Sequence, residues 1–210
     1  LYRVDAQTGD VTRIVRGEPG TTNISRWAWS PDGKAVFYHL IDRSSKVQTI
    51  VRRELETGKE QIIDSSAMMP RIRDLTLSPD GRQLAMIRFD SKPGMGITVM
   101  SAKGGEPREI LRVKEPEYIY GGFWREGLAW TPDGRYLLFG KARGDAEGQT
   151  VELWRVPVEG GEPQRLGVAM DNVRDVRVHP DGRRISFTAG KRGAEVWKME
   201  NFLPDLTASR

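Results

Sequence analysis

Apolar and polar residues alternate in short stretches that recur along the chain. Each of four Pro-Asp-Gly triplets is preceded by apolar residues two and four positions before its proline. These residues are Trp27 and Trp29, Leu75 and Leu77, Leu128 and Trp130, and Val176 and Val178. A period of two with one apolar face predicts β-strands whose apolar side is buried between neighbouring sheets. No window shows a helical stripe, so we predict an all-β fold.

The triplets begin at residues 31, 79, 132 and 180, which spaces the copies about 50 residues apart. Proline presets the backbone of a tight turn, aspartate accepts local N–H groups, and glycine supplies the positive φ that closes a hairpin. Strand-forming runs such as "KAVFYHL" and "RYLLFGK" follow the turns, and a second hairpin follows each first one. Such a period fits four antiparallel strands, the size of one propeller blade.

The strand order, labelled A to D from the centre outward, predicts an incomplete ring. Both chain ends supply a C strand, so we expect the C-terminal part of a six- or seven-bladed β-propeller whose open blade faces can self-associate. The expected propeller segment is 1–204, with strands C and D in 1–15, full blades at 24–63, 72–112 and 123–167, strands A to C in 173–199, and a tail at 205–210.

The repeats resemble the TolB-type, WD40-like β-propeller family. The resemblance is carried by "WSPDGK" from Trp29 and by "LWRVPVEGGEP" from Leu153, and it extends from Leu1 to about Pro204. It implies a bacterial, periplasmic or otherwise exported protein whose propeller binds a protein or peptide without catalysis. The same repeat also occurs in the propellers of prolyl-oligopeptidase-type hydrolases and in sensor proteins and kinases.

Composition narrows the chemistry. The chain has 210 residues, a net charge of +4 with both signs interspersed, and no cysteine, which excludes disulfides and thiolate chemistry. No apolar run is long enough to cross a bilayer, and no run of like charges predicts nucleic-acid binding. His39, at the expected end of a strand, and His179, in a turn, match no metal motif. We therefore predict no catalytic residue, no metal site and no cofactor.

The longer connections should lie on one side of the propeller, and we take that side as the candidate functional face because binding residues concentrate on loops. The stretch 113–126 carries the aromatic residues Tyr118, Tyr120 and Trp124. Either this expected loop binds a peptide or sugar, or its aromatic rings fold back and fill space above the blades.

A second candidate site lies where the inner strands begin. Residues five and six positions before each proline form a mixed set of charges, in which the resemblance accounts for Asp74 and Asp175 but not for Arg26 and Gly127. The candidate binding residues here are Arg73, Asp74, Glu126, Arg174 and Asp175. They could bind an anionic or zwitterionic ligand, since arginine offers two parallel donors, or they could form mutual salt bridges and anchor loops between neighbouring blades.

Three functions follow as hypotheses. The first is a non-catalytic scaffold that binds a protein or peptide on its loop face. The second is the gating propeller of a larger prolyl-oligopeptidase-type hydrolase, or part of a sensor. The third is a propeller lyase or hydrolase with its own site at the channel mouth, although the two histidines speak against its metal-dependent forms.

Overall fold

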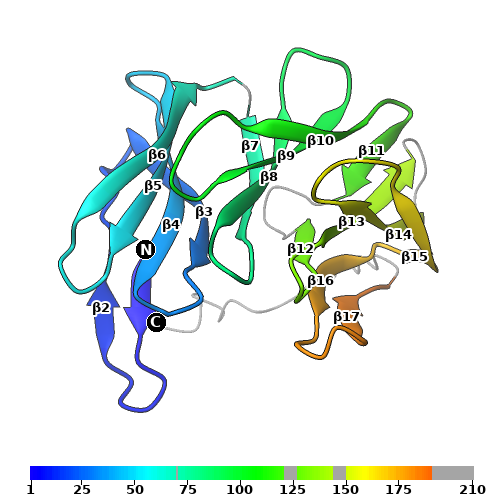
Figure 1. The fold of residues 1–210 in the computed structure, drawn as a ribbon. Helices are drawn as coiled ribbons and strands as arrows, with labels where there is room; N and C mark the ends of the chain where they lie inside the picture. The colour runs from blue at the N-terminus through cyan, green and yellow to red at the C-terminus, as the bar shows by residue number, and fades with distance from the viewer. Residues whose placement is uncertain (70, 121–126, 144–149, 191–210) are drawn as a thin grey trace, which may run out of the picture.

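The computed structural model describes residues 1–69, 71–120, 127–143 and 150–190. Every regular secondary-structure element assigned in these ranges is a β-strand. They form antiparallel sheets that follow one another along an arc, from the β1–β2 hairpin at one end to β16–β17 at the other (Figure 1). The all-β fold with four-stranded antiparallel blades is thereby confirmed. None of the described residues belongs to a helix long and apolar enough to span a membrane.

The sheets use consecutive strands. The first is a hairpin of β1 (Tyr2–Val4) and β2 (Val11–Arg13). The second contains β3 (Thr22–Trp29), β4 (Ala35–Asp42), β5 (Val47–Glu54) and β6 (Glu60–Ala67). The third contains β7 (Arg71–Leu77), β8 (Gln83–Phe89), β9 (Met95–Ser101) and β10 (Arg108–Val113). We call every sheet a blade and number the blades by their place in the chain, so that the β1–β2 hairpin is blade 1.

Blade 4 contains β12 (Leu128–Trp130), β13 (Tyr136–Arg143), β14 (Thr150–Pro157) and β15 (Gln164–Asp171), with β11 (Glu117–Tyr120) also paired to β13. Blade 5 contains β16 (Arg174–Val178) and β17 (Ile185–Thr188). The third strand expected for this last blade, and the tail after it, lie outside the described residues.

The Pro-Asp-Gly turns form as predicted. In the first copy the Gly33 N–H donates to the Ser30 carbonyl at 2.9 Å, and Asp32 accepts the Lys34 N–H at 3.0 Å. Gly33 has a φ of 68°, which glycine adopts without strain. The same closure recurs at Gly81, Gly134 and Gly182, so one local device sets the first hairpin of four sheets.

The cores lie between successive blades. Phe37 and Ile50 of blade 2 pack on Leu84 and Met86 of blade 3. Ile87 and Ile97 of blade 3 belong to one cluster with Leu137 and Phe139 of blade 4. Because blades 2, 3 and 4 each bury residues on both of their faces, the stability of each depends on its neighbours.

Several expectations need correction. Residues 113–126 are not a continuous loop, because β11 occupies Glu117–Tyr120. β12 has three residues and leaves the second half of the eight-residue β13 free, and β11 fills that space. His39 does not end its strand but lies inside β4.

A further correction concerns the tryptophans before the first turn. Trp130 is 8% exposed, but Trp27 and Trp29 are 52% and 42% exposed, so they are not sandwiched between sheets. The β1–β2 hairpin packs on this face of blade 2 through Leu1 and Ile14, which contact the cluster around Val36 and Tyr38. Its two strands cover only part of the face, and the indoles of β3 are left in solvent.

Candidate functional site

The candidate site lies along the inner strands, with Arg26 and Asp74 inside β3 and β7 rather than at their starts, and β-bulges shape it. The inner strands β3, β7, β12 and β16 contact one another in that order. The register shifts between Ile24 and Arg26 in β3, between Ile72 and Asp74 in β7, and between Arg174 and Arg177 in β16. A bulge redirects side chains at the end of a strand. Arg73, Asp74, Arg174 and Asp175 therefore sit at or beside irregularities in the strands.

Asp74 joins blade 3 to blade 4. Its side chain is buried, with 2% exposed, and its Oδ2 accepts the N–H groups of Gly127 at 2.7 Å and Leu128 at 2.9 Å. Its Oδ1 accepts the N–H of Leu75 at 2.9 Å. Burial raises the pKa of Asp74, and the three amide donors oppose that shift. Asp74 thus links the two blades through hydrogen bonds to backbone N–H groups.

Arg26 and Arg73 bring two guanidinium groups near the contact between β3 and β7. The Arg26 Nε donates to the Arg73 carbonyl at 2.7 Å, and the Arg73 guanidinium lies 5.6 Å from the centre of the Phe89 ring. Burial lowers the pKa of both arginines, and the charge of Arg26 lowers that of Arg73 further. The charge of Asp74 opposes the shift at Arg26, so an anionic group already acts on this arginine.

Arg174 and Asp175 lie at the start of β16 and remain partly exposed. The Arg174 Nε is 3.7 Å from the Asp175 Oδ2, and their side chains are 29% and 46% exposed. Asp175 has a φ of 53°, an uncommon conformation for a residue other than glycine. Because this ion pair is long and solvated, it can rearrange around a ligand at little energetic cost.

The tyrosines of β11 lie on one face of the strand, with ring centroids 6.4 Å apart. Both are half-buried against the cluster that joins blades 4 and 5. The Tyr120 hydroxyl donates to the Asn172 Oδ1 at 3.1 Å, and the Asn172 Nδ2 donates to the Gly190 carbonyl at 2.9 Å. Tyr120 thus connects β11 to the entry of blade 5, while Trp124 and Glu126 lie outside the described residues.

A polar chain through blade 2 was not predicted from the sequence. Ser25 Oγ lies 2.8 Å from His39 Nδ1, and His39 Nε2 lies 3.1 Å from the Gln48 Oε1. The Gln48 Nε2 then donates to Ser66 Oγ and to the Ala67 carbonyl. Burial lowers the pKa of His39 to about 4, so the imidazole is neutral near pH 7. The sequence did carry one signal of this chain: His39 lies two residues after Phe37 in the same strand, so a polar side chain falls on the buried face.

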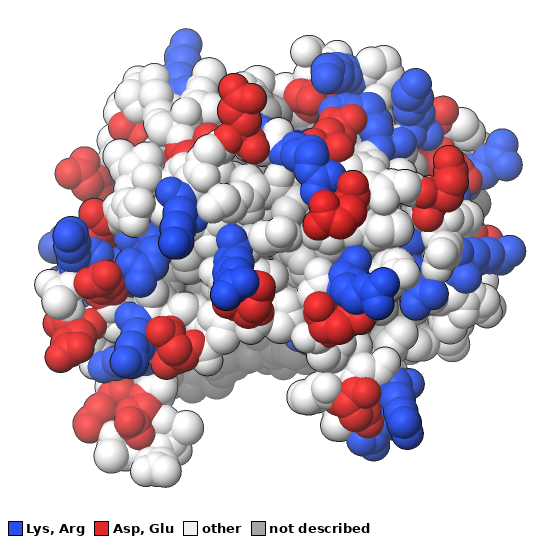
Figure 2. Space-filling view, in the orientation of Figure 1, with Lys and Arg blue, Asp and Glu red and all other residues white. Residues whose placement is uncertain are grey.

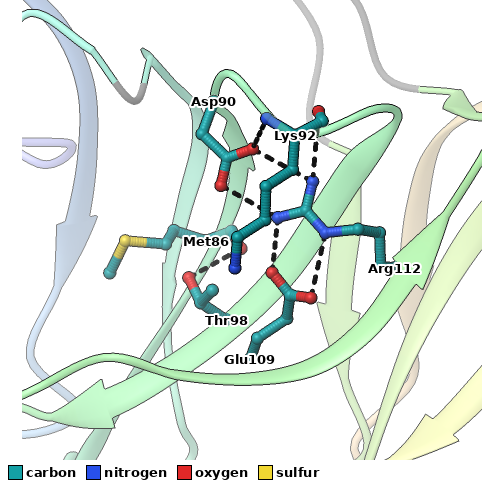
Figure 3. Close-up of polar contacts among 6 residues, drawn as sticks. All are labelled: Met86, Asp90, Lys92, Thr98, Glu109 and Arg112. Atoms are coloured by element: carbon teal, nitrogen blue, oxygen red, sulfur yellow. Dashed lines mark hydrogen bonds and ion pairs between the residues drawn. The ribbon is translucent and has the colours of Figure 1, made fainter.

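Arg112 fixes the connection between β8 and β9 to β10 (Figure 3). Its guanidinium donates to both carboxylate oxygens of Asp90, at 3.1 and 2.9 Å, and to Glu109. The ion pairs with these two acids raise the pKa of Arg112. A Cβ at Gly96 would approach Glu109 Oε2 to 2.8 Å, so glycine leaves room for this cluster. Ion pairs of Arg112 therefore tie the β8–β9 connection of blade 3 to β10.

The blades, their inter-blade clusters and the bulged inner strands define a partial β-propeller. The chain belongs to the family of the lipoprotein LpqB β-propeller domain, whose model matches residues 3–193. No curated protein sequence is similar enough to count as a relative.

Three solved structures show the same fold. TolB from Acinetobacter baumannii matches 92% of this chain and 43% of its own, with a TM-score of 0.67 and 17% identity. Oligogalacturonate lyase from Vibrio parahaemolyticus matches 88% and 51%, with a TM-score of 0.65 and 14% identity. A prolyl endopeptidase matches 86% and 28%, with a TM-score of 0.60 and 15% identity. The chain thus spans about half or less of these proteins, and the likeness shows the fold alone.

Proposed function

We propose that this propeller segment is a non-catalytic scaffold that binds a protein or peptide at the inner rim of its loop face. We define the inner rim as Arg26, Arg73, Tyr118, Arg174 and Asp175. The supporting observation is the pair of partly buried cations, Arg26 and Arg73, where β3 and β7 meet. The guanidinium group offers two parallel donors to a carboxylate, so an acidic side chain or a chain terminus is the ligand group that suits this pair.

The described residues favour binding over chemistry. Asp74, whose charge acts on Arg26, already accepts three amide N–H groups and is closed to solvent. Positive and negative side chains are interspersed over the face of the molecule seen in Figure 2. This face therefore gives no reason to propose long-range electrostatic attraction of a highly charged polymer such as a nucleic acid. The family is named for a lipoprotein and the fold is shared with TolB, which supports our proposal of an exported, bacterial protein.

The rival function is a gating propeller in a larger hydrolase or a sensor. The likeness to a prolyl endopeptidase favours it, because this chain would correspond to about a quarter of such a protein. In that case the inner rim would select substrates for a catalytic domain rather than hold a stable partner. The lyase hypothesis draws only on the fold shared with oligogalacturonate lyase.

Site-specific photo-crosslinking separates these proposals. A photoreactive residue at Arg174 of the inner rim is compared with one at Arg183, an exposed residue in a Pro-Asp-Gly turn. A scaffold should give one discrete crosslinked protein from Arg174 and none from Arg183, and Arg73→Gln should reduce its yield severalfold. Equal crosslinking from both positions, or an unchanged yield in Arg73→Gln, would contradict binding at the inner rim.

A further inference from the structure

The polar chain of blade 2 crosses all four strands and ends at the hydroxyl of Ser25. The Gln48 Nε2 donates to Ser66 Oγ at 3.2 Å and to the Ala67 carbonyl at 3.0 Å. The Gln48 Oε1 faces His39, and because an amide oxygen only accepts, His39 Nε2 carries the hydrogen of their 3.1 Å contact. The Nδ1 of the neutral imidazole is then an acceptor, and the Ser25 hydroxyl donates to it at 2.8 Å.

The hydroxyl of Ser25 differs from that of a serine in a Pro-Asp-Gly turn. Ser30 donates to Asp32 at 2.6 Å, and its oxygen accepts the Ala35 N–H at 2.8 Å. The Ser25 oxygen accepts no hydrogen bond from any residue that the structure describes. Its lone pairs are therefore open to an electrophile while its proton is directed at a base. A hydroxyl bonded to a base that a third group orients is the arrangement of an activated nucleophile.

A bulge presents Ser25 on the inner strand of the blade. The register of β3 shifts between Ile24 and Arg26, so Ser25 is the extra residue of this bulge. Ser25 is half-buried, whereas His39 is only 1% exposed. A small reagent can therefore reach the serine without meeting the imidazole behind it.

A cation lies next to the same hydroxyl. The Arg26 Nη1 donates to the Ser25 carbonyl at 2.6 Å, which holds the guanidinium beside this residue. An attack by a serine oxygen on a carbonyl group creates negative charge on the carbonyl oxygen. A fixed positive charge in a partly buried place stabilises such an oxyanion.

We propose that Ser25 is a nucleophile that takes up acyl groups from activated esters, with His39 as its base and Gln48 as a positioning residue. The Ser25 Oγ forms a bond to the carbonyl carbon of the ester, and its proton passes to His39 Nδ1. The bond from this carbon to the leaving oxygen then breaks, and the leaving oxygen takes the proton from His39. The products are an acylated serine and a free alcohol or phenol, and the imidazole is neutral again.

The environment of His39 limits the esters that can react. Burial lowers the pKa of His39 to about 4, and the charge of Arg26 lowers it further. Among the strands packed against β4, β5 brings the neutral Gln48, and β7 brings Arg73 and Asp74, which act on Arg26. The imidazole is thus a weak base that stays neutral down to acidic pH. We therefore expect transfer from esters with good leaving groups, and no turnover of alkyl esters or peptides.

Acetylation by p-nitrophenyl acetate tests the proposal. The protein reacts at about pH 6, where lysine amines are protonated and react slowly, and peptide mapping by mass spectrometry then locates the acetyl groups. Ser25 should be acetylated about tenfold or more faster than Ser30, which serves as an internal control, and His39→Gln should remove most of this difference. Ser65→Ala, at an exposed serine of β6, should leave the rate at Ser25 unchanged.

The pH dependence separates an assisted serine from an ordinary hydroxyl. The rate at Ser25 should rise as His39 loses its proton near the pKa of about 4 and stay level between about pH 5 and 7. An ordinary hydroxyl reacts through its small ionised fraction, so its rate rises about tenfold per pH unit. Gln48→Glu tests the positioning residue, because a carboxylate beside the imidazole raises the pKa of His39 and should move the midpoint upward.

Three outcomes would overturn the proposal. Equal acetylation of Ser25 and Ser30 would mean that the hydroxyl is not activated. An unchanged rate in His39→Gln, or a rate that climbs steadily through this pH range, would exclude the imidazole as the base. An unmoved midpoint in Gln48→Glu would contradict the role of Gln48. A thermal melt shows that each variant is folded before rates are compared, and the Ser30 comparison and the pH profile need no variant.

This activity is independent of partner binding at the inner rim. Uptake of an acyl group modifies Ser25, and a scaffold can function without it. Crosslinking from Arg174 and acetylation of Ser25 are separate measurements, so the failure of one proposal leaves the other standing.

Discussion

The contact between blades 3 and 4 and the exposed face of blade 2 are built from the same sequence positions. Leu128 and Trp130 precede the third turn as Trp27 and Trp29 precede the first. The former pair is 3% and 8% exposed and the latter 52% and 42%. The difference lies in the neighbouring sheet: blade 3 presents four strands to blade 4, and the hairpin presents two to blade 2. Alternation therefore specifies which face of a strand is apolar, and the neighbour decides whether that face is buried.

The largest expected effect tests the buried contact between blades 3 and 4. Trp130→Ala should lower the free energy of unfolding by about 3–5 kcal/mol, because it removes a large buried ring from the cluster shared by blades 3 and 4. Urea denaturation followed by circular dichroism measures the change. Trp154, partly buried against the same cluster, offers a milder control as Trp154→Ala. A loss below about 1 kcal/mol for Trp130→Ala would mean that this contact contributes little to the fold.

Much of this architecture could be predicted because the repeat is local. The turns depend on residues within the triplets, and the strands beside them follow from a period of two. β11 was missed because its four residues complete the length of β13, which is decided by the short β12 rather than by any signal in Tyr118–Tyr120. The exposure of Trp27 was missed for a similar reason, since burial depends on a neighbouring sheet that the repeat does not encode.

The candidate site was predictable only in part. The position of Asp74 five residues before the proline predicted the start of an inner strand, whereas the structure places it inside β7, beside a bulge. Its two hydrogen bonds to Gly127 and Leu128 cross from one blade to the next. These residues are 53 and 54 positions away in the chain, and no local sequence pattern indicates contacts between residues so far apart. The polar chain through His39 likewise depends on four strands in register, which alternation along one strand cannot show.

The second-largest effect tests the hydrogen bonds of Asp74 that link blades 3 and 4. Asp74→Ala should cost about 2–3 kcal/mol, because the buried N–H groups of Gly127 and Leu128 lose their acceptor. Asp133→Ala, at an exposed turn, should cost clearly less. Chemical denaturation at pH 7 compares the two variants. Equal losses would show that Asp74 acts only locally, as a turn aspartate does.

A smaller effect concerns the polar chain on the opposite, buried face of blade 2. The pKa of His39 lies at about 4 in the folded protein, below the ordinary value of 6.5, because burial disfavours the charged imidazole. The unfolded chain therefore binds the proton first, and stability should be complete above about pH 6.5 and fall as the pH drops toward 4. We expect His39 to account for a loss of about 2 kcal/mol between pH 7.5 and 4.5.

Comparison with His39→Gln isolates this contribution, because burial raises the pKa of Asp74 and gives that carboxyl the opposite trend in acid. Unfolding free energies are measured for both proteins at the two pH values. The variant should lose less stability on acidification than the parent. If the two proteins lose the same amount, His39 is not the group that titrates.

The smallest effect tests the exposed face. Trp29→Ala should change the free energy of unfolding by less than about 1 kcal/mol, because the indole is already 42% exposed and leaves no enclosed cavity. It occupies the position in β3 that Trp130 occupies in β12, so the two alanine variants differ in the neighbouring sheet rather than in the repeat. Denaturation at low protein concentration keeps association from adding to the measured stability. A loss of several kcal/mol would mean that Trp29 is covered in solution, and the stability should then depend on protein concentration if a second copy covers it.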